Sequence, residues 1–345
     1  MRRRDLYSLA GAALAAAALE SRVAVTLDHL VGVLLPSASG DRLDEDLAPL
    51  TIKKAVTAVT DAKRTYQAGA YPAVLADLPD LLRRLHALSE ASDPADKRVH
   101  RLSADAYHVA ASILLKLGDV ALATVAAGRS LSYAHRSGDP VAVAASTRIV
   151  VHALMDTGHA EQAHHLASET AQAVLGERTL STPKTVSVIG ALQLRGAVAA
   201  AIAENRSVAH QLLDEAQRAA EHVPERGNLR WTGFNATNVQ LHRVNIALRL
   251  GDAGTAIDLA RQINPADVHL AERRASLYLD VAHAYTLWGK WDRAWKALVE
   301  AERAAPHEIA TRPTARRLVA TLAVSAPAHA RPHAVRLAQR AGVPL

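Results

Sequence analysis

Apolar and small residues alternate with polar ones at helical spacing between Ala275 and Pro306, a segment that contains one Gly at position 289. Ala282 and Tyr285 precede this Gly by seven and four residues, on what would be one face of a helix. Trp291, Ala294, Leu298 and Ala301 follow it at the same kind of spacing. The pattern predicts two antiparallel helices joined by a tight turn at Gly289, with small residues where the helices cross.

The order of small, aromatic, Gly, aromatic, Ala, large apolar, Ala and Pro in this segment matches the 34-residue tetratricopeptide unit. A helical hairpin of this type buries its apolar face only against neighbouring copies of itself. One well-formed copy therefore predicts more copies elsewhere in the chain, and it favours a protein that binds other molecules.

Similar turns recur along the chain at Gly69, Gly118, Gly158, Gly251 and Gly289, with a degenerate copy at Glu204-Asn205. At Asn205 we expect the Asn to supply the left-handed turn that Gly supplies elsewhere. An Ala follows four of the Gly residues by five positions, namely Ala123, Ala163, Ala256 and Ala294. The sequence thus predicts about six hairpins; the alternative is a generic helical bundle in which the Gly periodicity is accidental.

The predicted fold is an all-α, TPR-like α-solenoid over residues 47–345, a right-handed superhelix with a concave groove. Two helical segments, one ending near Leu322 and one spanning residues 328–342, are expected to cap the last hairpin. The polar stretches 177–184 and 224–230 are expected insertions. Residues 1–46 are expected to form a basic, Ala-rich N-terminal helix and a flexible joint at 36–46.

In this kind of repeat the first helix of each hairpin lines the groove, about 13, 10 and 6 residues before the turn. Those positions are polar, although packing on an Ala-rich helix does not require polar residues. The groove candidates are Asp105, His108, Arg148, His152, Arg195, Asn238, Asn245 and His283, with Ser112, Arg249 and Ser276 beside them.

Amide side chains can pair with both the N–H and the C=O groups of an extended peptide, and Arg can hold a carboxylate with two hydrogen bonds. A groove lined by Asn, His and Arg therefore suits a peptide or an extended protein segment. The alternative for each residue taken singly is a merely solvated helix face.

Composition narrows the possible chemistry. Half of the residues are hydrophobic, only 3% are aromatic, and no Cys is present, which excludes disulfides, thiolate catalysis and Cys-bound zinc. The net charge is +6, but Lys and Arg are interspersed with Asp and Glu, so direct nucleic-acid binding by this chain alone is not expected. The pair His164-His165 lacks HExxH spacing, and no nucleophile elbow or phosphate loop occurs, so we expect no enzyme activity, metal or cofactor.

The N-terminus allows two interpretations. Arg2-Arg3-Arg4 followed by the mild apolar run 8–19 is similar to a twin-arginine export signal, which would make the chain an exported binding protein. The alternative is an Ala-rich helix with a basic first turn. The apolar run is too short to span a membrane, so no membrane association is expected.

Two segments, 100–119 and 231–252, the latter continuing to Pro313, together resemble the C-terminal tetratricopeptide half of actinobacterial XRE-class helix-turn-helix regulators. The resemblance implies a cytoplasmic sensor module in transcription regulation, with a possible homodimer contact, that binds a signalling peptide or metabolite. Asn238 is then the first candidate for gripping a peptide backbone, followed by Asn245 and Arg148. The DNA-reading helix of such regulators has no counterpart here, so DNA binding is not carried over; a general protein-interaction scaffold remains the alternative function.

Overall fold

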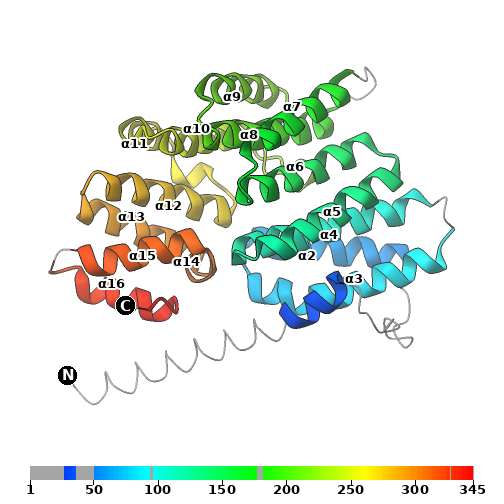
Figure 1. Cartoon of the computed structure of the whole chain (residues 1–345), viewed down its shortest axis with the longest axis horizontal. Helices are drawn as coiled ribbons and strands as arrows, with labels where there is room; N and C mark the ends of the chain where they lie inside the picture. The colour runs from blue at the N-terminus through cyan, green and yellow to red at the C-terminus, as the bar shows by residue number, and fades with distance from the viewer. Residues whose placement is uncertain (1–26, 36–49, 94–95, 177–181, 327, 345) are drawn as a thin grey trace, which may run out of the picture.

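The computed structural model describes residues 27–35, 50–93, 96–176, 182–326 and 328–344. This part of the chain is helical with no strand, which confirms the all-α prediction (Figure 1). The proposed export signal or basic linker at the N-terminus, the joint at 36–46 and the first part of the 177–184 insertion lie outside the described residues.

Twelve helices of the described chain form six antiparallel pairs that pack one after another in chain order, an arrangement consistent with an α-solenoid (Figure 1). The pairs are α2 (Ile52–Gln67) with α3 (Tyr71–Ala91), α4 (Lys97–Leu117) with α5 (Val120–Ser137), α6 (Pro140–Asp156) with α7 (Ala160–Gly176), α8 (Pro183–Ile202) with α9 (Arg206–Ala220), α10 (Ala236–Arg249) with α11 (Ala253–Arg261), and α12 (Ala271–Leu287) with α13 (Trp291–Ala304).

The five Gly turns fall where the sequence places them, each between the two helices of a pair, with φ between 64° and 84°. This left-handed backbone costs Gly little because it has no Cβ. The prediction for Asn205 is wrong: Glu204 takes the left-handed conformation, with φ of 59°. Asn205 instead caps α9, where its side-chain oxygen accepts a hydrogen bond from the backbone N–H of Val208 at 3.2 Å.

The Ala residues five positions after the turns lie where the paired helices cross. Ala123, Ala163, Ala256 and Ala294 are each at most 1% exposed. A methyl side chain at the crossing lets the two helix axes approach closely, and Ala carries no helix-propensity penalty. The Gly-x4-Ala pattern in the sequence therefore marks four of the six hairpins.

Three helices follow the last pair: α14 (Pro306–Thr311), α15 (Pro313–Ser325) and α16 (Arg331–Arg340). The sequence predicted only the last two of these. Pro306 does end α13, as expected, but it also occupies the first turn of α14, a position where its missing N–H is not needed. The short α14 matters because it carries Glu308 into contact with the beginning of the chain.

An insertion between α9 and α10 folds back into the molecule and is held by the only Phe of the chain. The Phe234 side chain is fully buried. A Cβ placed on Gly190 of α8 would lie 2.0 Å from the Phe234 ring, so the ring occupies the space that any larger residue at position 190 would need. This contact fixes the insertion over the first half of α8.

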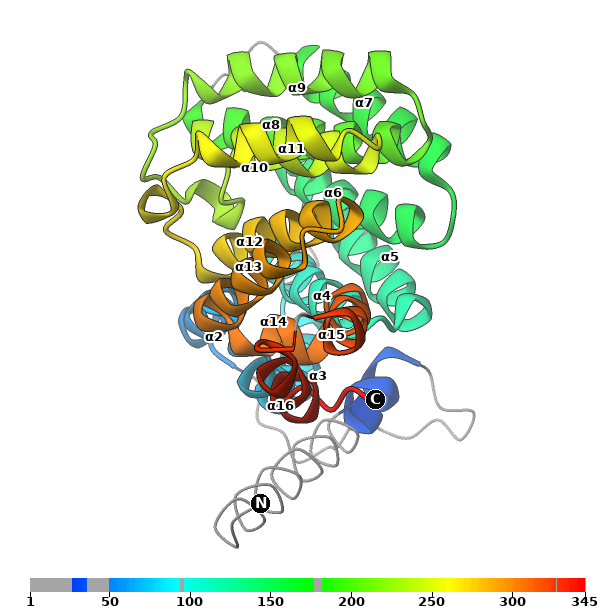
Figure 2. The ribbon, with the colours of Figure 1, turned by 90° about the vertical axis from the view of Figure 1, so that its left-hand side faces the viewer.

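The described chain closes on itself, so the expected open groove is a cavity. Lys116 of α4 donates hydrogen bonds to Glu308 of α14, 192 residues later, and Tyr71 of α3 also donates to Glu308. Figures 1 and 2 show α14 beside the first helices of the chain, on the opposite flank from α8 and α9. We call the group Tyr71, Lys116, Glu272, Glu308 and Arg312 the seam.

One described helix, α8, is long and apolar enough to cross a membrane by length and composition alone. In the fold, however, 83% of its apolar window is buried by other parts of the protein. Neighbouring helices on several sides, including α6, α7, α9 and α10, provide that cover. Its all-round apolar character is that of a central core helix.

Candidate ligand cavity

A central cavity of about 530 Å³ lies inside the ring of helices. Its lining comes from the first helix of every pair, α2, α4, α6, α8, α10 and α12, together with the Asn228–Thr232 loop and the start of α15. Seven of the eight groove candidates line it: Asp105, His108, Arg148, His152, Arg195, Asn238 and Asn245. Ser112, Arg249 and Ser276 line it as well. Whether these residues bind a ligand stays a prediction, but the structure brings them to one place.

His283 is the exception. It is exposed and does not line the cavity, although it holds the same position before its turn as His152 and Asn245 do before theirs. Only the N-terminal part of α12, from Glu272 to Asp280, faces the cavity. The next turn of the helix lies beyond the cavity. In the last hairpin, the residue six positions before the Gly turn is therefore exposed to solvent and does not line the cavity.

Several lining residues escaped the sequence analysis although a simple signal marks them. Gln67, Lys116 and Asp156 each stand two residues before a Gly turn, the position that the already named Arg249 holds before Gly251, and all three line the cavity. The same count of six residues before the turn, applied to Gly69, finds Lys63. No comparable signal marks the remaining charged lining residues, which are Arg230, Glu272, Arg273, Asp280, Arg312 and Arg317.

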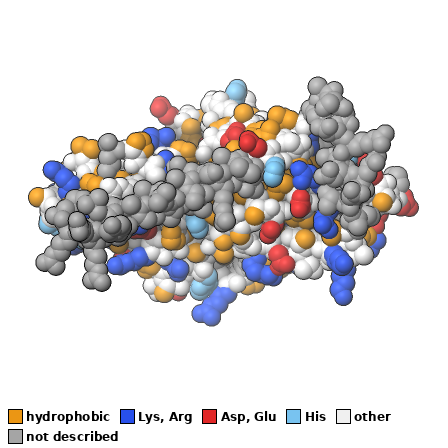
Figure 3. Space-filling model, turned by 90° about the horizontal axis from the view of Figure 1, so that it is seen from below, with side chains coloured by type: hydrophobic (Ala, Val, Ile, Leu, Met, Phe, Trp, Pro, Cys, Tyr) orange, Lys and Arg blue, Asp and Glu red, His pale blue; other side chains and the backbone are white. Residues whose placement is uncertain are grey.

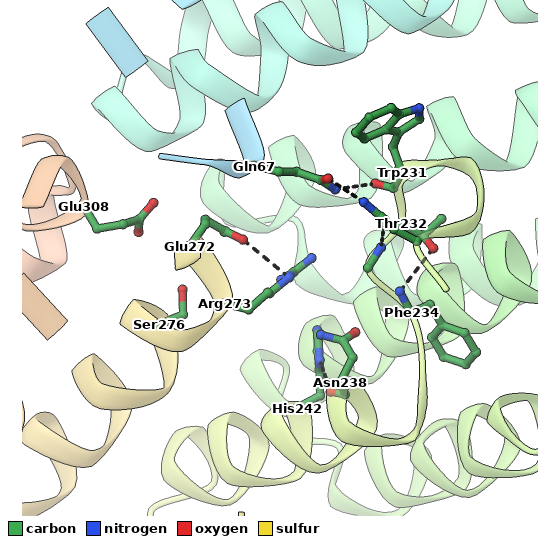
Figure 4. Close-up of polar contacts among 12 residues, drawn as sticks. Gln67, Trp231, Thr232, Phe234, Asn238, His242, Glu272, Arg273, Ser276 and Glu308 are labelled. Carbon is green, nitrogen blue, oxygen red and sulfur yellow. Dashed lines mark hydrogen bonds and ion pairs between the residues drawn. The ribbon is translucent and has the colours of Figure 1, made fainter. Parts of the chain in front are cut away.

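Asn238 is buried and its side-chain amide nitrogen has no hydrogen-bond partner in the described chain. The residue is 3% exposed, and its own backbone N–H is already bonded to the side chain of Asn235 at 2.7 Å. An unsatisfied buried donor costs about 1–3 kcal/mol, so its retention in a cavity wall is a mark of a binding site. Figure 4 shows the Asn238 side chain next to His242 on α10, facing the α12 residues across the cavity.

Asn245, by contrast, is fully used within the protein. Its amide nitrogen donates to both carboxylate oxygens of Asp280, at 3.0 and 2.9 Å, and its oxygen accepts from Arg249 at 2.8 Å. Burial raises the pKa of Asp280, and the bond from Asn245 opposes that shift. Asn245 therefore supports the wall of the cavity and has no free donor to offer a ligand.

The three cavity histidines are neutral at pH 7. The His108 Nε2 atom lies 2.8 Å from a guanidinium nitrogen of Arg148. Since a guanidinium can only donate, that ring nitrogen must be an unprotonated acceptor. Burial, followed by the charge of Arg148, lowers the pKa of His108 well below its ordinary value, and burial likewise lowers the pKa of His152, and that of His242 to about 3.

Arg148 and Arg195 carry positive charge that no carboxylate neutralises by direct contact. Arg148 bonds only to the neutral His108, and its buried Nε atom has no partner in the described chain. Arg195 forms no hydrogen bond or ion pair with any described residue, although Asp156 attracts it from further away. Burial, followed by the charge of Arg273, lowers the pKa of Arg148 to about 10. Burial, followed by the charges of Arg148 and Arg273, lowers the pKa of Arg195 to about 9. Both guanidinium groups stay protonated at pH 7.

The seam is, by contrast, well paired. Lys116 donates to Glu272 at 2.7 Å and to Glu308 at 2.9 and 3.1 Å, and Arg312 donates to Glu308 at 3.1 Å. Burial alone would lower the pKa of Lys116, but the two carboxylates outweigh it and raise that pKa. Glu308 is completely buried, so each of these bonds is made away from bulk water.

A second contact closes the ring near the Asn228–Thr232 loop (Figure 4). The Gln67 side chain donates to the backbone carbonyl of Trp231 at 3.1 Å and accepts from the Asn228 amide at 2.6 Å. Arg230 and Trp231 have φ of 53° and 59°, a conformation that L-residues avoid. Strain of this kind persists where surrounding contacts hold it, and it is frequent at ligand clamps.

Glu161, His164 and His165 gather on α7, outside the central cavity, with ligand-type atoms within 4.8 Å of one another. His164 Nε2 lies 3.1 Å and His165 Nε2 3.4 Å from the Glu161 carboxylate, which stands one turn earlier on the same helix. On the outer surface, Lys and Arg are interspersed with Asp and Glu in the visible part of the face in Figure 3.

No family model matches the chain, and no curated protein matches it. Among solved structures, the chain is similar to one described as the crystal structure of BtubC (BKLC) from P. vanneervenii. The identity is 13%, the match covers 72% of this chain and 90% of that chain, and the TM-score is 0.43. A likeness this distant carries no argument about fold or function.

Proposed function

We propose that the chain is a tetratricopeptide-like α-solenoid that acts as a sensor: it binds a small ligand or short peptide in its central cavity and carries out no covalent chemistry. The observation that carries the proposal is the lining of a 530 Å³ cavity by polar side chains from all six first helices. Ligand pockets for small molecules commonly measure about 300–1,000 Å³ and combine apolar walls with a few convergent polar groups.

The closed ring narrows the class of ligand. An extended protein segment lying along an open groove would have to part both the seam and the Gln67 contact with the Asn228–Thr232 loop. A small molecule or a peptide of a few residues fits the cavity without breaking either contact. The extended partner expected from the sequence is therefore the weaker candidate.

A binding event can be transmitted because the cavity residues belong to separate hairpins. Arg148 lies on α6, Arg195 on α8, Asn238 on α10 and Arg273 on α12. A ligand that contacts several of them fixes the rotation of one hairpin against the next, and in a solenoid such small rotations accumulate along the chain. A cytoplasmic role in transcription regulation, as in the XRE-class regulators, is the form of sensing that we propose.

The test is a thermal-shift screen of the full chain against panels of short peptides and small metabolites, followed by calorimetry on each hit. We expect Asn238→Ala to weaken binding about tenfold or more while leaving the unfolding temperature nearly unchanged, since its amide makes no internal bond. Asn245→Ala is the matched comparison. It removes the hydrogen bonds that Asn245 makes to Asp280 and Arg249, so we expect it to lower the unfolding temperature even without ligand.

Transmission needs a separate measurement. The chain has no Cys, so spin labels can be attached at Val56→Cys on α2 and Arg303→Cys on α13, both exposed positions. Electron resonance then reports the distance between α2 and α13, which lie on either side of the ring closure, with and without ligand. A hit that binds inside the cavity but leaves this distance distribution unchanged would support a passive scaffold or carrier instead of a sensor.

A further inference from the structure

The charges around the cavity are unbalanced among the described residues. Nine Lys and Arg side chains line it against four Asp and Glu, an excess of five positive charges that falls to four when Glu308 of the seam is included. The three lining histidines add nothing, because His108, His152 and His242 are neutral at pH 7. A large part of the net charge of +6 therefore points inward.

Part of this excess is a cluster of three arginine side chains. Three of the four acidic lining residues are already engaged: Asp105 pairs with Lys63 at 2.7 Å, Glu272 with Lys116, and Asp280 with Asn245. The fourth, Asp156, lies 3.9 Å from the His152 ring. Three of the nine basic lining residues, Arg148 on α6, Arg195 on α8 and Arg273 on α12, lie close together. Each of the three is close enough to the other two to repel them.

These three residues also leave donors unused. The Nε atoms of Arg148 and Arg273 are buried without a hydrogen-bond partner in the described chain, as is the amide nitrogen of Asn238. The Arg273 Nε atom lies 3.4 Å from Glu272, an ion pair without a hydrogen bond (Figure 4). Burying several cations with unmade bonds is costly, and only an anion can supply acceptors and opposite charge at once.

We propose that the cavity binds a small molecule through an anionic group, a carboxylate or a phosphate, held by the guanidinium groups of Arg148, Arg195 and Arg273 with Asn238 donating beside them. This inference rests on the proposed sensor function and names its ligand class. Guanidinium groups bind both anions through paired, charge-assisted hydrogen bonds. The excess of about four charges favours a ligand with more than one negative charge. Such a ligand removes the repulsion among the three arginines and so joins three hairpins.

Calorimetry of the full chain with inorganic phosphate, citrate and acetate, at constant ionic strength, tests the inference and separates the two anion classes. We expect phosphate or citrate to bind the wild-type chain and to bind Arg195→Gln about 10- to 100-fold more weakly. Arg195→Lys keeps the charge but loses the planar fork, so an intermediate affinity is expected. Arg261→Gln, which removes an exposed arginine paired with Asp258 outside the cavity, is the control and should bind like wild type.

A second readout guards against a folding artefact. Without ligand, Arg195→Gln should unfold at the same or a higher temperature than wild type, because it removes a buried charge that has no contacting partner. Added phosphate or citrate should then raise the unfolding temperature of the wild type by more than that of the variant.

The outcomes are distinguishable. Equal anion binding by wild type and Arg195→Gln, or no binding of any of the three anions to the wild type, overturns the inference. If the anions fail but peptides with blocked termini and no acidic residue bind in an Asn238-dependent way, the anionic ligand is wrong and the sensor function stands. If neither the anions nor the peptide and metabolite panels bind, both proposals fall.

Discussion

Lys116 and Glu308 are joined by hydrogen bonds of 2.9 and 3.1 Å although 192 residues separate them in the chain. Lys116 stands at the end of α4, and Glu308 lies on the short α14 that follows the sixth helical pair. Their contact turns a row of hairpins into a ring, and it defines one wall of the cavity. Separate variants can test how much this contact, the Gly turns and the buried histidines each contribute to stability.

Removing the Glu308 carboxylate should weaken the seam. In Glu308→Gln, Arg312 loses its ion pair and Lys116 keeps only Glu272. Breaking a buried pair in this way typically costs about 3–5 kcal/mol, so we expect a loss of that order in the free energy of unfolding by urea. X-ray scattering should also show a larger radius of gyration if the ring opens.

The control for this variant is Glu300→Gln, which breaks an exposed pair with Arg303 one turn away on the same helix. A pair of this kind contributes less than about 1 kcal/mol. If the two variants were equally stable, the seam would not hold the ring closed.

Two Gly turns with nearly the same φ allow the energetic cost of backbone strain to be measured apart from the cost of a steric clash. Gly118 and Gly251 have φ of 83° and 84°. A Cβ at Gly251 would meet nothing within 4 Å, whereas one at Gly118 would lie 2.6 Å from the Pro313 ring at the start of α15. We expect Gly251→Ala to cost about 1–2 kcal/mol from the left-handed backbone alone. Gly118→Ala should cost clearly more, and thermal unfolding of the two variants side by side measures the difference.

Gly190→Ala tests whether Phe234 anchors the insertion before α10. The added methyl group would overlap the Phe234 ring, which is fully buried and has no room to move outward. Overpacking of this kind costs about 1–3 kcal/mol. Hydrogen exchange should then quicken in the Asn228–Thr232 loop. Unchanged protection there would show that the polar contacts of the loop with Gln67 and Ser187 hold it without the Phe234 ring.

Acidification should destabilise the protein in two steps. Burial lowers the pKa of His242 from 6.5 to about 3, so the unfolded chain takes up a proton below pH 6.5 that the folded chain refuses. Stability is therefore complete above pH 6.5 and falls as the pH drops, by at most about 1.4 kcal/mol per pH unit for each such histidine. His242→Gln should flatten the decline between pH 6.5 and 4.5, as measured by urea unfolding at each pH.

The second step belongs to Glu272. Burial alone would raise the pKa of its carboxyl, but Lys116 and Arg273 outweigh burial and depress it well below the ordinary value of 4.5. Its contribution is thus present above pH 4.5 and lost as the pH falls further. A stability that stayed constant from pH 7 to pH 4 would contradict the neutral, buried state assigned to the histidines and the pairing assigned to Glu272.

Much of the hairpin architecture could be predicted because its determinants are local. In four of the six hairpins, a Gly in the left-handed region and a buried Ala five residues later mark the turn and the start of the second helix within a dozen residues. The same phase placed Asp105, Arg148 and Asn238 on the inner side of their helices, and the structure finds them in one cavity.

The failures are equally specific. Glu204, not Asn205, takes the left-handed turn, because the packing of α8 against α9 imposes a backbone that the residue itself disfavours. His283 follows the correct phase but lies outside the cavity. The missed α14 is only six residues long, too short for a helical period to show in the sequence.

The sequence by itself determined that the chain is helical, where it turns, and which side of each first helix is polar, because these depend on spacings of a few residues. Only the tertiary structure decided that the row of hairpins closes, that Glu308 meets Lys116, and that Arg148, Arg195 and Arg273 share one cavity. Closure depends on the sum of small rotations between successive hairpins, and the pairing of distant charges follows from that sum. No local pattern of residues encodes the closure of the ring.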